Sequence, residues 1–404
     1  MKTYADLLRT PGVARILVAQ LAARFPGGLL SIGLLIHIEG IFHSYGAAGI
    51  VLGALSIGQA VSGPLTARWM GVWGIRPVLI LTSLVCATAL TAVALLVVPL
   101  AAFAALALLV GLSFPPIQPA VRTIYPKIVT GRQLSPLFSL DATAQEIIWI
   151  AGPVVVTFVA TQVSSVAGIL LSVFFILAGG AWFISSPEVG RVRIPRSKRR
   201  FGVVLTRPPV VFTTIVGLLV IGSFAATEAG VVATFGDHGN ANAGIVLAIW
   251  SVASFAGGLA FGHLPIRPWT LARRLLVITV GVVLASFAWE FWTLTAALVV
   301  AGICIAPALA VMSAVVAVSV RFSDTAEAYG WVGTGQLIGV GIGSAVAGFA
   351  IDGAGPVGAF WVAGAFVAAG TLVAIVFHRI VPDLRGRDAS PIPDTEPVPI
   401  QPPS

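Results

Sequence analysis

Repeated apolar segments, each about long enough to cross a bilayer, constrain this chain more than any other feature. A membrane-crossing helix needs about 20 mostly apolar residues, and lipid offers the backbone no hydrogen-bond partners, so helices are the expected element. The segments are residues 13–38, 46–69, 76–98, 100–120, 137–162 and 165–185, then 209–235, 242–264, 272–294, 295–320, 327–351 and 356–379. In agreement, 58% of the 404 residues are hydrophobic and only 9% are charged. We therefore expect an all-α membrane protein with 12 transmembrane helices in two pseudo-symmetric six-helix bundles.

Polar stretches divide the chain into four parts. We expect an N-terminal six-helix bundle over residues 1–186 and a C-terminal six-helix bundle over residues 208–381. Between them, residues 187–207 form a basic linker that contains "RVRIPRSKRR". Residues 382–404 form a proline-rich tail with little apolar surface to bury, so we expect this tail to be disordered.

The basic residues all fall on one side of the predicted membrane, with the single exception of Arg24. Because cytoplasmic loops carry the excess of Lys and Arg, both termini are expected in the cytoplasm. The sequence favours a multi-pass protein of the bacterial inner membrane, monomeric and in contact with the lipid bilayer. Topology explains the strongly basic composition, which is therefore no argument for a nucleic-acid partner.

The two halves of the sequence echo one another. "SIGQAVSGPLTARW" at residues 56–69 resembles "SVASFAGGLAFGHL" at residues 251–264, and each leads into the tripeptide "IRP". Residues 111–116 read "GLSFPP" and residues 302–307 read "GICIAP", with proline five residues after the glycine in both. Repeats of this kind are typical of transporter folds, and the prolines predict helix kinks.

The stretch "GPLTARWMGVWGIRP", between the second and third apolar segments, resembles a signature of the major facilitator superfamily. Gly63, Arg68, Gly74 and Arg76 match its glycine and basic positions, whereas Ala67 replaces its aspartate. This resemblance implies a fold of two six-helix bundles, secondary active transport by alternating access, and a gating role for the four matching residues.

Other function classes find no support in the sequence. There is no Gly-x-Ser-x-Gly motif, no lysine after a glycine as in a phosphate-binding loop, and no metal-ligand spacing, so we expect neither an enzyme nor a cofactor. "IAGPVV" at residues 150–155 resembles the core of the antiporter motif of drug exporters. We therefore expect proton-coupled export of small organic, drug-like molecules. Uptake of a small anionic metabolite that pairs with Arg24 is the alternative, and a channel or a sensor without transport activity is a third possibility.

Charged residues inside the apolar segments are the main candidates for substrate binding and proton coupling, because each is costly in a membrane. They are Arg24, Asp141, Glu146 and Glu228. We expect Glu146 or Glu228 to be the ionic partner of Arg24. Asp141 lies close to the cytoplasmic end and is interpreted equally well as a solvated residue. A static ion pair that fixes helix packing is the alternative to a functional one.

Polar and aromatic side chains in the segments are candidates for lining a cavity, although interhelical hydrogen bonds are an equally ordinary use of such groups. The cavity-lining candidates are Gln59, Gln118, Trp149, Trp250 and Gln336. Gly335, Gly339 and Gly343 form a stripe of small residues, which we expect at the contact between the two halves.

Overall fold

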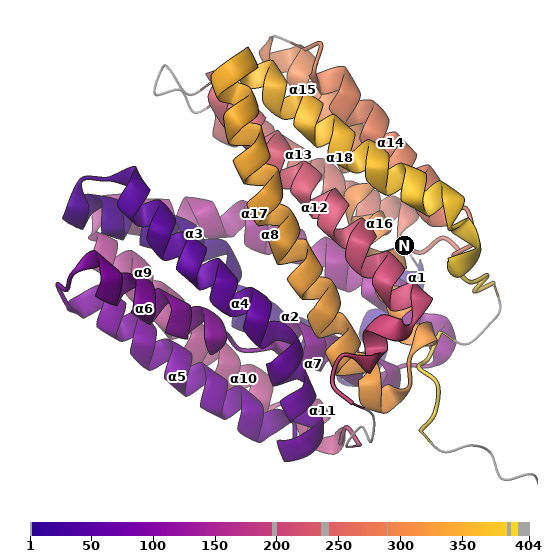
Figure 1. Ribbon diagram of the computed structural model, residues 1–404. Helices are drawn as coiled ribbons and strands as arrows, with labels where there is room; N and C mark the ends of the chain where they lie inside the picture. The colour runs from indigo at the N-terminus through magenta and orange to yellow at the C-terminus, as the bar shows by residue number, and fades with distance from the viewer. Residues whose placement is uncertain (1, 196–199, 236–241, 289, 386–388, 395–404) are drawn as a thin grey trace, which may run out of the picture.

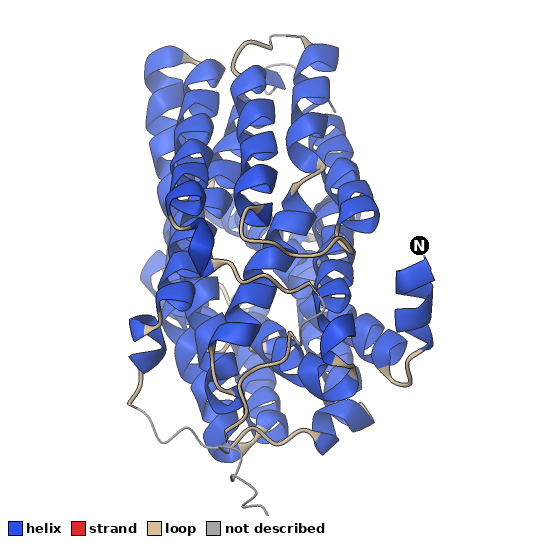
Figure 2. Ribbon diagram, turned by 90° about the vertical axis from the view of Figure 1, so that its right-hand side faces the viewer, coloured by secondary structure: helices blue, strands red, loops and turns tan. Residues whose placement is uncertain are grey.

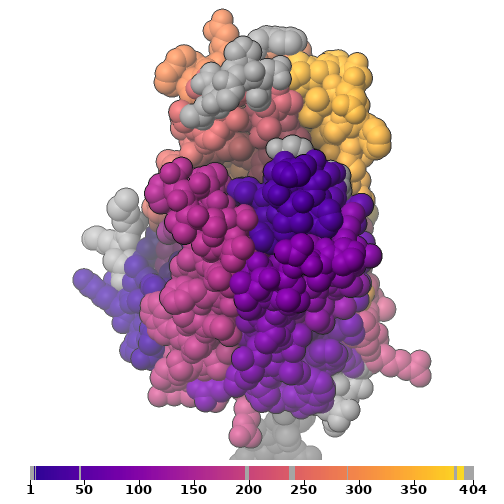
Figure 3. All heavy atoms as spheres, turned by 90° about the vertical axis from the view of Figure 1, so that its left-hand side faces the viewer, coloured from indigo at the N-terminus to yellow at the C-terminus, as the bar shows by residue number. Residues whose placement is uncertain are grey.

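The computed structural model describes residues 2–195, 200–235, 242–288, 290–385 and 389–394. Within these ranges the chain is helical almost throughout, and its one β-contact is an isolated bridge between Arg321 and Ile392 (Figure 2). The helices form two groups, with the N-terminal half at the lower left and the C-terminal half at the upper right in Figure 1. Figure 3 views the molecule from the side of the N-terminal half, with the C-terminal half rising behind it.

The N-terminal half begins with a short helix, α1 (Lys2–Arg9), and then crosses six times. The crossings are α2 (Val13–Arg24) with α3 (Pro26–Phe42), α4 (Tyr45–Trp73), α5 (Ile75–Leu95), α6 (Leu100–Leu112) with α7 (Ile117–Ile128), α8 (Gly131–Gln162), and α9 (Ser165–Phe174) with the π-helical turn η1 (Phe175–Gly179) and α10 (Gly180–Ser185). The linker that follows holds α11 (Pro187–Arg191) and η2 (Val203–Thr206).

The C-terminal half repeats this arrangement. Its helices are α12 (Pro208–Phe235), α13 (Asn242–Phe261), α14 (Thr270–Ala285), α15 (Phe291–Gly302) with α16 (Ile305–Ser319), α17 (Thr325–Ala354) and α18 (Pro356–Val376), with short 3-10 turns η4 (Phe322–Asp324) and η5 (His378–Ile380). Of the helical stretches in the described residues, 11 are long and apolar enough to cross a membrane. The expected ninth crossing corresponds to α14, which has 16 residues and ends before the predicted boundary at residue 294.

Three crossings are broken at the positions of their prolines. The first crossing breaks at Phe25, directly before Pro26 and after Arg24. The "GLSFPP" and "GICIAP" segments separate α6 from α7 and α15 from α16, which confirms the predicted kinks. Pro307 lies in the first turn of α16, where a missing N–H group breaks no helical hydrogen bond.

The two halves touch one another at the end of the molecule that carries the basic loops, which we call the basic end. The helix pairs that cross between the halves are α4 with α17, α7 with α17, α8 with α13 and α8 with α16. The backbones of α4 and α17 approach closely at Gly330, where a Cβ would lie 2.7 Å from Cα of Pro64 and 2.9 Å from the carbonyl oxygen of Gly63. One turn further, the Thr334 hydroxyl donates to the carbonyl of Ala60 at 2.7 Å.

Beyond that end the halves are not joined by any hydrogen bond, ion pair or ring contact within the part of the chain that the structure describes. The first half of α8, up to Glu146, is almost continuously buried, whereas Trp149, Val154 and Phe158 further along it are 51%, 67% and 65% exposed. The far ends of α4 and α17 likewise expose large apolar side chains such as Ile57 and Phe349. Within the described residues, the contacts between the halves are therefore concentrated at the basic end.

The glycine stripe of α17 lies elsewhere than expected. Gly335, Gly339 and Gly343 pack against the backbone of α12 at Thr214, Leu218 and Gly222, all within the C-terminal half. The stripe thus serves close helix contact, as predicted, but within the C-terminal half rather than between the halves. These glycines allow two helices of one half to approach closely.

The tail is also more ordered than its composition suggests. Ile392 pairs with the loop before α17 through two backbone hydrogen bonds, to Val320 and from Phe322, each 3.0 Å long. The Ala389 N–H donates to the carbonyl of Gly131, the first residue of α8, at 3.4 Å. The expectation of a disordered tail is thus wrong for residues 389–394, which join both halves at the basic end, while residues 386–388 and 395–404 lie outside the described residues.

Candidate functional site

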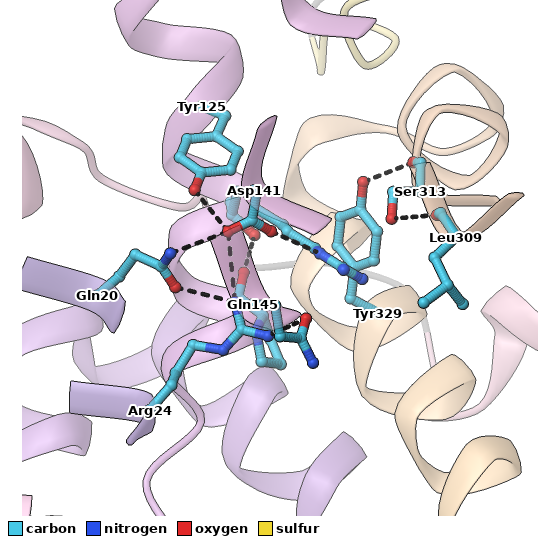
Figure 4. Close-up of polar contacts among 11 residues, drawn as sticks. Gln20, Arg24, Tyr125, Asp141, Gln145, Leu309, Ser313 and Tyr329 are labelled. Atoms are coloured by element: carbon cyan, nitrogen blue, oxygen red, sulfur yellow. Dashed lines mark hydrogen bonds and ion pairs between the residues drawn. The ribbon is translucent and has the colours of Figure 1, made fainter. Parts of the chain in front are cut away.

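Arg24 is buried in the N-terminal half, where it forms an ion pair with Asp141. Its Nη1 lies 3.3 Å from Oδ1 of Asp141, and both side chains are almost completely inaccessible. The Nη2 group donates to the amide oxygen of Gln145 at 2.5 Å, and Nη1 also donates to Gln20 at 2.9 Å. Figure 4 shows Gln20 and Arg24 pointing from α2 toward Asp141 and Gln145 of α8.

Helix geometry explains how four polar side chains meet here. Gln20 and Arg24 are four residues apart on α2, and Asp141 and Gln145 are four residues apart on α8, so each pair lies on one helix face. The two faces are turned toward each other, and Gln20 donates to Asp141 at 3.0 Å. Two polar pairs with a spacing of four residues, one on each helix, are the sequence signal for this contact.

A third helix, α7, contributes a second arginine and a tyrosine. The Tyr125 hydroxyl donates to Oδ1 of Asp141 at 3.0 Å, and Nε of Arg122 lies 3.7 Å from Oδ2 of the same carboxylate. The Gln118 amide, in the orientation that satisfies its own groups, accepts from both terminal nitrogens of Arg122, at 3.0 and 2.9 Å. Arg122 also stacks over the ring of Tyr329 on α17, 5.4 Å from its centre, and so contacts the C-terminal half.

In this state of the protein, the arrangement differs from three expectations. The ionic partner of Arg24 in this structure is Asp141 rather than Glu146 or Glu228, and Asp141 is fully buried rather than solvated. Arg122 was expected in a cytoplasmic loop, together with the other basic residues, but it is buried among the helices. The resulting cluster holds two guanidinium groups and one carboxylate. Because buried charges are costly unless paired and hydrogen-bonded, these groups depend on one another.

Glu146 lies five residues beyond Asp141 on α8 and contacts the other half of the molecule. Its Oε1 accepts a hydrogen bond from the Ser254 hydroxyl of α13 at 2.8 Å. The side chain is buried, and it makes no ion pair within the part of the chain that the structure describes. A carboxyl group thus lies at the contact between the halves without a cationic partner among the described residues.

The other candidates are spread over both halves. Glu228 on α12 has an exposed side chain, and no hydrogen bond or ion pair of it is found among the described residues. Trp250 of α13 is 5% exposed and packs edge-to-face on Phe224, 5.6 Å between ring centres, whereas Trp149 is 51% exposed. Gln59 on α4 and Gln336 on α17 are partly buried. The structure therefore does not gather the predicted cavity residues into one cluster.

The predicted gating residues form two separate contacts. Arg68 of α4 pairs with Glu327 of α17 at 2.8 Å across the two halves, and the other oxygen of Glu327 accepts from the backbone N–H of Gly202 in the linker at 2.7 Å. Gly63 lies at the crossing of α4 with α17. Glu327 and Ser254 are the cross-half partners that sequence reasoning did not identify.

Gly74 and Arg76 act within the N-terminal half. Gly74 has φ of 91°, a left-handed conformation that favours glycine, at the turn between α4 and α5. Arg76 donates from Nε to the carbonyl of Ile184 at 3.0 Å, which ties α5 to α10. Gly152 of the "IAGPVV" segment packs against Gly28 of α3, so this glycine serves helix contact inside the same half.

Comparisons with known proteins agree on one fold. A sequence profile of the Major Facilitator Superfamily matches residues 16–289 and 237–401. A sequence search of curated proteins finds no match.

Among solved structures, a bacterial homologue of the iron transporter ferroportin in an outward-facing state is similar, with a TM-score of 0.74, 13% identity and coverage of 91% of this chain and 99% of that one. The human organic anion transporter TETRAN has a TM-score of 0.71 and 15% identity over 90% of this chain and 98% of that one. The proton:xylose symporter XylE has a TM-score of 0.72 and 12% identity over 94% and 98%.

Proposed function

Because this chain belongs to the Major Facilitator Superfamily and is a multi-pass membrane transporter, we propose that it couples proton movement to the export of small, largely apolar organic molecules by alternating access. The basic end would face the cytoplasm of a bacterium, as the distribution of Lys and Arg indicates. The structure described above would then be an outward-facing state of a monomer in the inner membrane.

The observation that carries the proton-coupling proposal is the position of Glu146. Its carboxyl group is buried at the contact between α8 and α13, and its hydrogen-bond partner is a neutral serine. A buried carboxylate without a cation is stabilised by binding a proton. Because the residue lies where the halves meet, its protonation and the separation of the halves act on the same contact.

In this mechanism the cluster around Asp141 has a supporting role. Arg24 ends α2 at the break of the first crossing, and its ion pair fixes that break against α8, which also carries Glu146. Asp141 is held in place by Gln20, Tyr125 and the two arginines, whereas Glu146 is the group proposed to exchange protons. Asp141 and Glu146 would thus perform different tasks on one helix.

Exposed apolar and aromatic side chains on the helices that meet between the halves favour an organic substrate. Trp149 on α8 and the large apolar residues of the far halves of α4 and α17 are examples. Together with the exporter-like "IAGPVV" segment, they support apolar molecules as the transported class.

A specific observation keeps uptake of a small anion as a second candidate. The buried cluster holds Arg24 and Arg122 against the single carboxylate of Asp141, so it carries an excess positive charge. One similar structure, TETRAN, is described as an organic anion transporter. Since Arg24 is paired with Asp141, an anion would have to reach Arg122 or displace that carboxylate.

The test has two stages. A panel of fluorescent aromatic compounds, cationic, neutral and anionic, is screened for thermal stabilisation of the purified protein, and the stabilising compound is then used in proteoliposomes. Counterflow of labelled against unlabelled compound is expected, because a carrier exchanges substrate and a channel does not. Stabilisation by anionic compounds alone would support uptake of an anion over export of apolar molecules.

Topology is tested separately by single cysteines in intact cells. A cysteine in place of the exposed Gln162 is expected to react with an impermeant reagent, and one in place of the exposed Arg132 is expected to be protected. The reverse pattern would place the basic end outside and overturn the proposed direction.

A further inference from the structure

The Ser254 hydroxyl connects two groups that belong to different halves of the molecule. It donates to Oε1 of Glu146 at 2.8 Å and accepts from the backbone N–H of Ala306 at 3.2 Å. Ser254 is 1% exposed, so water does not compete for either bond. Because its oxygen accepts from a backbone N–H, the hydroxyl hydrogen is free to point at Glu146.

The N–H group that Ser254 accepts from lies in the first turn of a broken helix. α15 ends at Gly302 and α16 begins at Ile305, so the N–H of Ala306 has no partner within α16. Ser254 from α13 therefore satisfies the start of α16 in place of a local cap.

The surrounding packing fixes this geometry. A Cβ on Gly257 would overlap the carbonyl of Ile303, so α13 lies directly against the break between α15 and α16. On the other side, Ala142 of α8 packs on Ala306 and Ala310 of α16 in a small cluster of alanines. Because the three helices approach closely through glycine and alanine, the serine between them has little freedom to move.

We propose that Ser254 is a positioning residue that transmits the protonation state of Glu146 to the broken helix α15–α16, and so links proton release to opening of the basic end. A protonated Glu146 is neutral and fits the buried contact of α8 with α13 and α16, where the hydrogen bond with Ser254 keeps the basic end closed. Loss of the proton leaves a buried charge without a cationic partner, and the halves separate there more easily. This inference rests on the proposed role of Glu146 as the proton carrier.

Other titratable groups near α8 do not account for such an effect. The helices α13 and α16, which face Glu146 from the C-terminal half, contain no titratable side chain. On the N-terminal side, titratable groups near α8 lie on four helices. They are Arg24 on α2, Arg122, Tyr125 and Lys127 on α7, and Tyr4, Asp6 and Arg9 on α1. His37 and Glu39 lie near the far end of α3. None of these makes an ion pair or hydrogen bond with Glu146 among the described residues.

The experiment measures how far the basic end opens as a function of pH. Spin labels are attached at cysteines replacing the exposed residues Arg132 on α8 and Arg273 on α14, in a background with Cys86 and Cys304 changed to alanine. Distance distributions are recorded in lipid nanodiscs between pH 5 and pH 9. For the wild-type residues, the long-distance population is expected to grow as the pH rises.

Two variants and a control decide the result. Ser254→Ala is expected to increase the long-distance population at low pH, because the neutral Glu146 loses its partner, and to flatten the pH dependence, while Ser254→Thr restores the response because it keeps the hydroxyl. Ser313→Ala on α16 is the control, because this buried serine donates only within its own helix, to Leu309. A wild-type pH response in Ser254→Ala would overturn the inference, and so would an equal loss of response in the control.

Glu146→Gln separates this inference from the proposed function. If Glu146→Gln abolishes the pH response and Ser254→Ala does not, Glu146 senses protons by another route and only the role of Ser254 fails. If Glu146→Gln retains the full response, the proposed role of Glu146 fails as well. Loss of the response in both single variants, with no further change in the double variant, is the result expected here.

Discussion

Asparagine in place of Asp141 is expected to destabilise the protein more than glutamine in place of Arg24. The Asp141 carboxylate is the only one among the described residues that pairs with the two buried guanidiniums of this cluster. The Asp141→Asn change leaves both arginines buried without a counter-charge. Breaking a buried pair in this way costs about 3–5 kcal/mol.

Arg24→Gln has a smaller cost because its partner keeps other stabilising groups. Asp141 would still accept from Gln20 and Tyr125, each at 3.0 Å, and would retain Arg122 at 3.7 Å. The free energy of unfolding is expected to fall by about 1.5–3 kcal/mol, which is the contribution of hydrogen bonds made by a charged group. The double change to glutamine and asparagine should therefore cost less than the sum of the two single changes.

The assay is reversible unfolding in mixed micelles of increasing denaturing detergent, with the free energy of unfolding compared for the four proteins. Asp383→Asn is the control, since Asp383 forms an exposed pair with Arg385, whose hydrogen bonds lower the pKa of this carboxyl to about 2. Exposed pairs add little, so no clear change is expected there. A loss in Arg24→Gln equal to or greater than that in Asp141→Asn would refute the assigned roles.

Three further changes test other parts of the fold. Ala67→Asp introduces a carboxylate at a fully buried position next to Arg68 in the sequence, where it is expected to compete with Glu327 for this arginine. The population with an open basic end should then grow in the spin-label distance measurement, and an unchanged population would show that this loop does not gate. Gly339→Ala should lower stability by about 1–3 kcal/mol through overpacking against α12, whereas Gly341→Ala, which has open space around its Cβ, should be neutral or stabilising in the same unfolding assay. Ending the chain after Arg385 removes the tail that joins α8 to the loop before α17, and this truncation should also favour the open basic end. A truncated protein that opens no more than the full chain would show that the tail does not hold the two halves together.

The sequence predicted much of the architecture because the physical signals are local. Apolar length predicted the crossings, and proline position predicted the breaks in the fourth and tenth crossings. The ninth crossing was overextended because the apolar run continues past the end of α14 at Ala285. The embedded charge of Arg24 was identifiable for the same reason, since one arginine in an apolar run is conspicuous.

The partners of these charges were less predictable, because they depend on helix rotation and depth. Asp141 lies near the start of α8 and was interpreted as solvated, but α2 and α7 cover it with Gln20 and Tyr125. The pairing of Ile392 with the loop before α17 uses backbone groups, so the composition of the tail gave no sign of it. Glu327 and Arg68 are 259 residues apart, and only the packing of the halves brings them together.

Gradient-driven transport by Glu146→Gln tests the central claim most directly. Wild-type and variant proteins are reconstituted in proteoliposomes with the stabilising compound, and both counterflow and accumulation under an imposed pH gradient are measured. The account predicts that Glu146→Gln still exchanges labelled for unlabelled compound but no longer accumulates it against its gradient. Accumulation by Glu146→Gln equal to that of the wild-type protein would contradict the proposal that Glu146 carries the coupled proton.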